Sequence, residues 1–221
     1  MARLSIATED YLKAVWALSA HGRVTTTALA SELGVSAASA TAMLKKLARL
    51  GLVDHAPYHG VALTAAGERV AVEVVRHHRL IESFLVEALG VPWDEVHEEA
   101  EHWEHVLSEQ LERRMDEALG HPTTDPHGAP IPAQDGEVAE RASVRLAELE
   151  AGQRAIVAEV SDDDPELLRY LGGFGLYPGT EIEVVDAAPF EGPLTFRAAG
   201  GSHAVGREAA RHVRVREVRA A

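Results

Sequence analysis

Residues 25–53 read TTTALASELGVSAASATAMLKKLARLGLV, and this stretch decides the fold of the N-terminal part of the chain. One of the opening threonines caps a first helix, which ends at Gly34. Ser36 caps a second helix, which Gly51 stops. Two helices joined by a tight glycine-containing turn, the second rich in small residues and followed by Lys and Arg, form a helix-turn-helix pattern.

The segments on either side extend this pattern to a winged helix over residues 1–64. Residues 6–20 place apolar side chains at helical spacing, with Thr8 as a cap. After the second helix, LVDHAPYHGVALT predicts two short strands around a turn that contains Tyr58. A β-hairpin directly after such a helix is a wing, and the whole unit is typical of a module that binds DNA.

Composition limits the class of protein. The chain has 221 residues, 46% of them hydrophobic, and no cysteine, which excludes disulfides and any metal site built on thiolates. No signal peptide or transmembrane run is evident, so we expect a cytoplasmic protein with no membrane partner. The net charge of −14 is unevenly placed, since residues 1–63 hold six basic and four acidic side chains. A mildly basic N-terminal segment followed by an acidic remainder is consistent with a protein that contacts DNA through residues 1–63.

Histidines and carboxylates gather in the middle of the sequence. Seven of the twelve histidines fall between residues 77 and 127. We expect a long helix from Asp94 to about Leu119, containing DEVHEEAEHWEHVLSEQLERRM. Four of its potential ligands recur at helical spacing on one face. They are His97, Glu101, Glu104 and His105.

The preceding helix, capped by Thr64 and ending at Gly90, offers a second face. Its His78 and Glu82 lie one turn apart. Two packed helices that each present imidazole and carboxylate can converge on a divalent cation, and a site without sulfur suits Mn(II), Fe(II) or Zn(II). Several hard carboxylates favour Mn(II). We expect His77 and His102 to point to other faces, at the surface.

The remainder of the chain predicts a linker and a small β domain. Residues 120–143 are rich in Pro and Gly. From residue 144 onward, RAIVAEV, TEIEVVD, GPLTFRA and HVRVREV indicate short strands, with PELLRYLGGFGL as a helix that ends in a glycine turn. The predicted fold class is therefore mainly α with β. The predicted domains are a winged helix-turn-helix (1–64), a helical metal-sensing domain with linker (65–143) and an SH3-like domain (144–221).

Four motifs in order along the chain resemble the iron- and manganese-dependent repressors of the diphtheria toxin repressor family. They are TEDYLKAVW, RHHRLIESFL, VHEEAEHWEHVLSEQLERR and DPHGAPIP. The resemblance covers essentially the whole chain, and it implies that residues 65–143 are a metal-sensing and dimerisation domain and that residues 144–221 are FeoA-like. It implies a homodimer that binds double-stranded operator DNA when loaded with metal and represses metal-uptake genes. It implies no enzymatic activity and no organic substrate.

The resemblance also implies two metal sites. The primary site would use Asp10, Glu101, Glu104 and His105. A second site would use His78, Glu82 and His97, with His127 and Asp125 of the DPHG loop as a cap and one carboxylate from Asp162, Asp163 and Asp164. For that aspartate triplet, a solvated turn with a helix cap is an equal alternative.

The types of ligand indicate which metal the sites prefer. Iron-type members carry Met and Cys where this chain has Asp10 and Glu101, and hard oxygen donors favour Mn(II), as in manganese-type members. In contrast, HWEHVLSEQLERR reads like the iron-type helix, so Fe(II) is the alternative. Lys13 stands where some short manganese members have a further acid. Co(II), Ni(II) or Zn(II) can substitute in vitro.

The DNA-reading residues follow in part from the family pattern and in part from charge. The resemblance implies that the groove is met by short side chains at the start of the second helix of the motif: Ser36, Ala38, Ser39 and Thr41. The basic side chains that follow can reach phosphates, and the tip of the wing adds an aromatic contact. These are Lys45, Lys46, Arg49 and Tyr58.

Two other functions compete with this interpretation. A metalloenzyme would need an open metal position and a general base, and the sequence carries no separate base or nucleophile motif. A DNA-binding regulator that senses an organic ligand would leave the His and Glu faces with a structural role. Metal-binding calorimetry separates that alternative from a metal sensor.

Overall fold

The computed structural model describes residues 4–20, 22–56, 60–139, 142–162 and 164–220. The chain divides into two compact units, each built from several segments. The first comprises Met1–His78, His102–Glu112 and Pro132–Glu137. The second comprises Arg79–Glu101, Arg113–Ile131 and Val138–Ala221.

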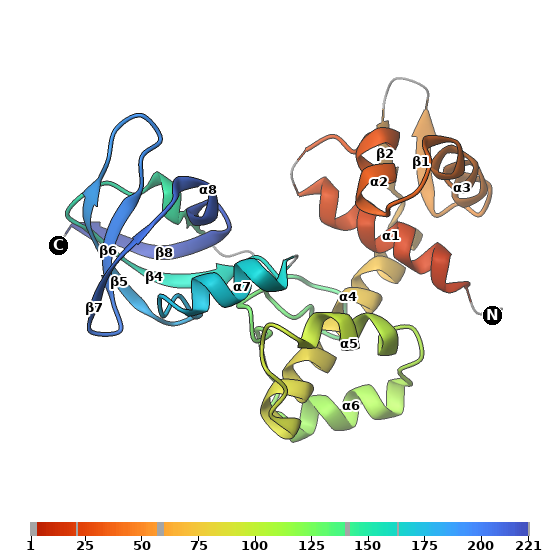
Figure 1. Cartoon of the computed structure of the whole chain (residues 1–221). Coiled ribbons are helices and arrows are strands. Elements are labelled where there is room, and N and C mark those ends of the chain that lie inside the picture. The colour runs from red at the N-terminus through yellow and green to blue at the C-terminus, as the bar shows by residue number, and fades with distance from the viewer. Residues whose placement is uncertain (1–3, 21, 57–59, 140–141, 163, 221) are drawn as a thin grey trace. The chain divides into compact units, whose positions relative to one another are not determined.

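The helix-turn-helix is present as predicted (Figure 1). Helix α1 is Ile6–Ser19, α2 is Thr26–Glu32 and α3 is Ala37–Arg49. The Thr25 side chain accepts a hydrogen bond from the Ala28 amide, and the Ser36 side chain accepts one from the Ser39 amide. Because these side chains satisfy amides that have no partner inside the helix, they fix where α2 and α3 begin.

One expected cap is wrong. Thr8 lies inside α1 and is buried, and Ser5 occupies the N-cap position in an extended conformation. Ser5 makes no side-chain cap hydrogen bond to the backbone, but its hydroxyl lies 2.9 Å from that of Thr8. The helix therefore starts one turn before the residue that the sequence favoured.

The wing is a two-stranded antiparallel ribbon of β1 (Val53–Ala56) and β2 (Gly60–Leu63). Its register pairs Val53 with Leu63 and Ala56 with Gly60. Residues 57–59, which include the predicted DNA contact Tyr58, lie outside the described residues. Fully buried leucines from α1, α2 and α3 form the core beneath the wing: Leu12, Leu29, Leu44 and Leu47.

Helix α4, Ala65–Leu89, follows the wing at once. The Thr64 hydroxyl accepts a hydrogen bond from the Gly67 amide at 3.2 Å, which confirms Thr64 as the cap. Gly67 is needed for a steric reason, because a Cβ there would lie 1.9 Å from the carbonyl oxygen of Leu52. This close approach holds the start of α4 against the end of the DNA-binding core.

The long helix expected from Asp94 to Leu119 is wrong. The structure has two helices in its place, α5 (Val96–Trp103) and α6 (Glu109–Ala118). A turn follows Trp103, whose carbonyl accepts from the amides of residues 106 and 107. Ser108 then starts α6, since its hydroxyl accepts a hydrogen bond from the Leu111 amide. Glu104 and His105 consequently lie in a turn and not on a continuous helical face.

The C-terminal part of the second unit is a six-stranded antiparallel sheet with strand order β3–β8–β4–β5–β6–β7. The strands are β3 (Val144–Arg145), β4 (Gln153–Val160), β5 (Glu181–Ala187), β6 (Leu194–Ala198), β7 (Gly201–Val205) and β8 (Val213–Ala220). The short helices are η1 (Leu146–Glu148), α7 (Pro165–Gly172) and α8 (Arg207–Ala210). Buried side chains such as Phe196, Leu168 and Leu194 form a separate core.

The predicted fold class, mainly α with a C-terminal β-rich domain, is confirmed. Strands β4, β5, β6 and β8 coincide with the segments that the sequence indicated, whereas β3 and β7 were not foreseen. Among the described residues, every helix is too short or too polar to cross a membrane.

Replacing Gly67 tests the close approach at the start of α4. We expect Gly67→Ala to lower the free energy of unfolding by about 1–3 kcal/mol, because the new methyl group overlaps the Leu52 carbonyl. Thermal unfolding followed by circular dichroism measures the effect. Gly206→Ser is the matched control, since no atom lies within 4 Å of a Cβ at Gly206. Equal stability of the two variants would contradict the packing argument.

Candidate metal centre

A first cluster of potential ligands lies within the first unit. Helix α1 contributes Asp10, and the turn after α5 contributes Glu104 and His105. The Nε2 atom of His105 is 2.8 Å from Asp10 Oδ1 and 3.2 Å from Glu104 Oε1. One ligand atom from each residue lies within 4.8 Å of the other two. Three of the four residues predicted for the primary site are thus brought together.

Two further side chains complete the surroundings of this cluster. The Nδ1 atom of His105 lies 2.7 Å from Glu9 Oε2, so both ring nitrogens of His105 face carboxylates. Lys13, one turn after Glu9 on α1, donates to both oxygens of Glu104 at 3.0 and 2.8 Å. Neither contact was predicted from the sequence, although Lys13 stands where some short manganese members have a further acid. A second signal is that Glu9, Asp10 and Lys13 share one face of a helix.

Two adjacent histidines of α4 also contact Glu104. The Nδ1 atom of His78 lies 2.5 Å from Glu104 Oε2. His77, expected at the surface, is instead buried, and its Nδ1 is 3.1 Å from the Glu104 carbonyl oxygen. The error arose because α4 is enclosed on several faces, so helical periodicity alone does not identify its exposed side.

His77 connects this cluster to a buried ion pair. Its Nε2 lies 3.4 Å from Glu112, which accepts a 2.6 Å hydrogen bond from Arg76. Burial lowers the pKa of His77, but the hydrogen bond and charge of Glu112 outweigh it and raise the pKa. The same interaction with His77, together with Arg76, lowers the pKa of Glu112 below its ordinary value. The backbone at Glu104 is thereby anchored to α6.

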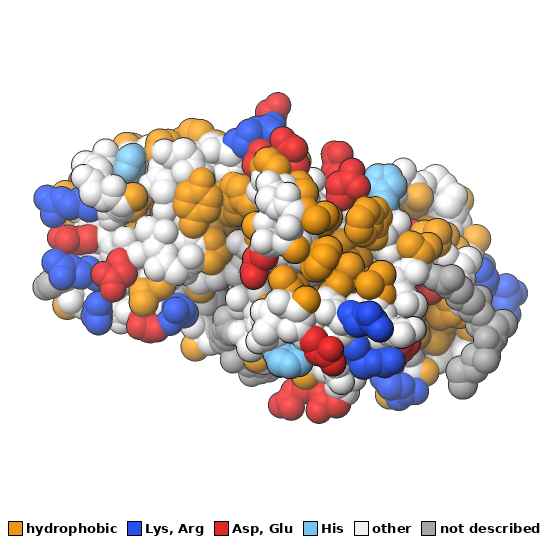
Figure 2. All heavy atoms as spheres, turned by 90° about the horizontal axis from the view of Figure 1, so that it is seen from below, with side chains coloured by type: hydrophobic (Ala, Val, Ile, Leu, Met, Phe, Trp, Pro, Cys, Tyr) orange, Lys and Arg blue, Asp and Glu red, His pale blue; other side chains and the backbone are white. Residues whose placement is uncertain are grey.

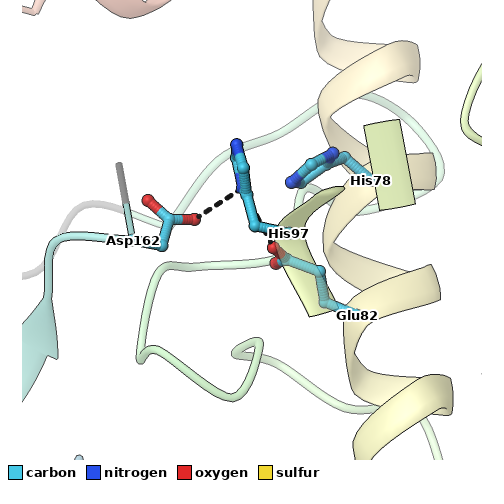
Figure 3. Close-up of side chains that lie close together, drawn as sticks. All are labelled: His78, Glu82, His97 and Asp162. Atoms are coloured by element: carbon cyan, nitrogen blue, oxygen red, sulfur yellow. Dashed lines mark ion pairs between the residues drawn. The ribbon is translucent and has the colours of Figure 1, made fainter. Parts of the chain in front are cut away.

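A second cluster lies within the second unit. Figure 3 shows His97 of α5 between Glu82 of α4 and Asp162, which follows β4; His78, one turn before Glu82, is also drawn. His97 Nδ1 is 3.4 Å from Glu82 Oε1 and 3.5 Å from Asp162 Oδ2. The carboxylates of Asp162 and Glu82 raise the pKa of His97 to about 10, against the opposing effect of burial.

Two of the three aspartates that follow β4 are described, and they differ in their contacts. The Asp164 side chain accepts hydrogen bonds from the amides of residues 166 and 167 and caps α7. Asp163 lies outside the described residues. Burial alone would raise the pKa of Asp162, but its hydrogen bond to His97 and the charges of His127 and His97 lower it. Of the two aspartates that the structure describes in this segment, Asp162 is the one that lies in the second cluster.

The DPHG loop lies against the same carboxylates. His127 is 1% exposed and donates from Nε2 to the Trp93 carbonyl at 2.7 Å. Its Nδ1 atom lies 3.7 Å from Glu82 and 3.8 Å from Asp162, and makes no hydrogen bond to any described residue. Burial lowers the pKa of His127, but these carboxylates outweigh it and raise the pKa to about 9.

Asp125 shapes the loop that carries His127. Its Oδ1 accepts hydrogen bonds from the amides of His127 and Ala129, at 2.9 and 3.0 Å. Its Oδ2 lies 3.6 Å from Arg79 Nε. Burial raises the pKa of Asp125 to about 7, and the nearby charge of Glu82 adds to this rise.

Both clusters fit a divalent cation by their chemistry. Their donors are carboxylate oxygens and imidazole nitrogens, the ligand types that Mn(II), Fe(II) and Zn(II) share. In the second cluster, the carbonyl of Trp93 fixes the tautomer of His127 and aims its Nδ1 at two carboxylates. Such an outer hydrogen bond is the usual way in which a protein orients a histidine ligand.

One residue predicted for the primary site, Glu101, belongs to a different unit from the other three. Glu101 is an exposed residue of α5 and belongs to the second unit, where His97 Nε2 is 3.9 Å from its carboxylate. Its predicted role in the primary site stays a prediction.

The predicted DNA-reading residues lie on and around α3 in the first unit. Ser36, Ala38 and Ser39 are exposed at its N-terminal end, and Lys45 and Arg49 are exposed further along. Three hydroxyls are already engaged: those of Ser36 and Ser39 with each other, and that of Thr41, which donates to the Ala37 carbonyl at 2.7 Å. Tyr58 lies outside the described residues.

Three family descriptions match successive parts of the chain. "Iron dependent repressor, N-terminal DNA binding domain" matches residues 3–61, and "Iron dependent repressor, metal binding and dimerisation domain" matches residues 64–133. "FeoA domain" matches residues 144–217. Together they define a DNA-binding repressor with a helical metal-binding and dimerisation domain and a β-rich C-terminal domain.

Individual relatives agree with this class. The iron-dependent repressor IdeR of Mycobacterium leprae is 36% identical over 190 residues, covering 80% of this chain and 83% of that protein. A solved manganese-dependent transcriptional repressor, in complex with manganese, has 40% identity and a TM-score of 0.87, covering 94% of this chain and 98% of its own. The structure of ScaR with bound Zn²⁺ has 34% identity and a TM-score of 0.80, covering 95% and 98%.

The chain therefore belongs to the family of IdeR and the diphtheria toxin repressor, which confirms the resemblance drawn from the sequence motifs. It is a metal-dependent transcriptional repressor of that family and not an enzyme.

Removing His127 tests the second cluster. We expect His127→Leu to weaken one class of divalent-metal sites about tenfold or more, because the oriented Nδ1 donor is lost. Isothermal titration calorimetry with Mn(II) measures the change. His102→Leu, at an exposed histidine, is the control and should leave the isotherm unchanged. An unchanged isotherm for His127→Leu would exclude His127 as a ligand.

Proposed function

We propose that this chain is a Mn(II)-dependent repressor that binds operator DNA as a homodimer and controls metal-uptake genes. The observation that carries the proposal is the Asp10–His105–Glu104 cluster, in which a residue of the DNA-binding domain meets residues of the metal-binding domain. The primary site is Asp10, Glu104 and His105, with Glu101 as a further ligand. The second site is Glu82, His97, His127 and Asp162, with His78 one turn before Glu82.

The choice of Mn(II) rests on the donors. Asp10 and Glu101 are hard oxygen ligands, and the chain has no cysteine to favour a softer metal. Two solved relatives are described as manganese-dependent repressors, at 40% and 36% identity. Fe(II) is the second candidate, because the relatives found by sequence include iron-dependent repressors at 36% and 35% identity.

The mechanism follows from where the ligands lie. A divalent cation supplies positive charge that offsets the mutual repulsion of the carboxylates. Asp10 extends from α1, which packs in the core beneath α2 and α3, so its engagement with Glu104 and His105 fixes the DNA-binding domain on the dimerisation domain. Two reading helices held in this way in a dimer match half-sites about 34–36 Å apart.

The reading itself falls to α3. Its exposed N-terminal side chains are small, so α3 can lie deep in the major groove, while Lys45 and Arg49 reach phosphates. Short side chains make few bidentate base contacts, and we infer that DNA shape contributes much of the specificity.

An apolar surface supports the homodimer. Within the first unit, Trp103, Val106 and Leu111 are 40%, 64% and 46% exposed. Figure 2 shows hydrophobic side chains gathered on the side of the molecule that carries α5 and α6. Exposed apolar patches of this kind mark association surfaces, and the matched family description includes dimerisation.

Replacing Asp10 tests the metal-controlled step. We expect Asp10→Ala to lose the Mn(II)-induced gain in operator affinity, a coupling of about 5–150-fold, because α1 is no longer tied to Glu104 and His105. An operator is first selected from random DNA with the Mn(II)-loaded protein and then titrated by gel shift at fixed salt.

Asp186→Ala, at an exposed aspartate of β5, is the matched control and should keep the full Mn(II) response. An Asp10→Ala protein with an unaltered Mn(II) response would refute the assignment. A larger response to Fe(II) than to Mn(II) in the wild-type protein would favour the second candidate metal.

Replacing Leu111 tests the association surface. We expect Leu111→Glu to shift the protein from dimer to monomer in sedimentation velocity, because a charge then lies in the apolar patch. Tyr170→Glu on α7, where the side chain is 47% exposed, is the control and should remain dimeric. A dimer that survives Leu111→Glu at micromolar concentration would place the interface elsewhere.

A further inference from the structure

Lys13 occupies a position in the first cluster that a simple surface lysine does not have. Its side chain is 20% exposed, whereas that of its partner Glu104 is 0% exposed. The ammonium group donates to both oxygens of Glu104, at 3.0 and 2.8 Å, and lies 3.3 Å from His78 Nδ1. One tethered cation thus engages both oxygens of a buried carboxylate that the proposed metal site requires.

Other charged groups around Lys13 explain why a cation is stable there. Glu9 and Asp10 precede it by one turn on α1, and His105 bridges their carboxylates. Glu104 approaches from the turn after α5. Three carboxylates within one cluster repel one another, and a buried carboxylate is costly unless it is paired. Lys13 offsets part of this charge.

We propose that the Lys13 ammonium is a built-in competitor of the divalent cation for Glu104, and that it sets the metal concentration at which the repressor is loaded. The proposal rests on the metal site of Asp10, Glu104 and His105 proposed above. The ammonium group and a divalent ion cannot both approach the Glu104 oxygens closely without strong repulsion in a buried setting. Metal binding therefore has to displace Lys13 from at least one of these oxygens.

The alternative role for Lys13 is to orient Glu104 for the metal, and the two roles predict opposite signs. A positioning lysine would be retained on loading, so its loss would weaken metal binding. A competing lysine costs free energy on loading, so its loss tightens binding. The engagement of both Glu104 oxygens favours competition, because an orienting donor would leave one oxygen available to the metal.

Competition also affects stability without metal. Since Lys13 compensates the buried charge of Glu104, its removal should lower the unfolding temperature of the chelator-treated protein. The increase in unfolding temperature on addition of Mn(II) should then be larger than in the wild-type protein. This readout does not depend on DNA binding.

The test compares Mn(II) binding of chelator-treated wild-type protein, Lys13→Met and Lys13→Gln by calorimetry. We expect both variants to bind Mn(II) about tenfold more tightly in one class of sites, since repulsion by the ammonium is removed. Lys13→Gln keeps a hydrogen-bond donor for Glu104 and guards against misfolding of the methionine variant. Arg69→Met, at an exposed basic residue of α4, is the control and should bind as wild type.

Comparison with the Asp10→Ala variant separates the failure of this proposal from the failure of the proposed function. If Asp10→Ala removes one class of sites and Lys13→Gln tightens that same class, both proposals stand. If Asp10→Ala removes a class that Lys13→Gln leaves unchanged or weakens, competition by Lys13 is refuted while the metal site stands. If Asp10→Ala removes no class, the metal site itself is refuted and the inference with it.

Discussion

The carboxylate of Glu104 is completely buried, and a buried charge has to be compensated by cations or hydrogen bonds. Its side-chain neighbours are Lys13, His78 and His105, and its backbone carbonyl is held by His77. These contacts come from α1, α4 and the turn after α5. The need to compensate one charge therefore joins the first helix of the DNA-binding domain to the helices that follow the wing.

The second cluster also compensates a buried carboxylate, here with two histidines. Glu82 is fully buried beside His97 and His127, and Asp162 adds a carboxylate from the segment after β4. The raised pKa values of the two histidines have one cause, the surrounding carboxylates, which favour positive charge at this position. A proton or a divalent cation can supply that charge. The cluster thus links α4, α5 and the DPHG loop with the β-rich domain, all within the second unit.

Local signals in the sequence predicted the parts of the fold that local physics determines. Caps at Thr25, Ser36 and Thr64 fixed helix starts, and alternating apolar residues placed four of the strands. The interruption between α5 and α6 was not predicted because the helical spacing of polar and apolar residues continues through it. The contacts of Lys13 with Glu104 and of Glu9 with His105 were not predicted because these partners are more than 90 residues apart, and only the folded chain brings them together. The same limit prevented a choice among Asp162, Asp163 and Asp164.

The most direct test is an anomalous diffraction map at the manganese absorption edge, from crystals of the full chain grown with Mn(II). We expect a peak within bonding distance of Asp10, Glu104 and His105, with the Lys13 ammonium displaced from at least one Glu104 oxygen. A second peak is expected beside Glu82, His97 and Asp162. A map in which Asp10 points away from Glu104 and His105, with no peak between them, would contradict the central claim that a cation ties α1 to this turn.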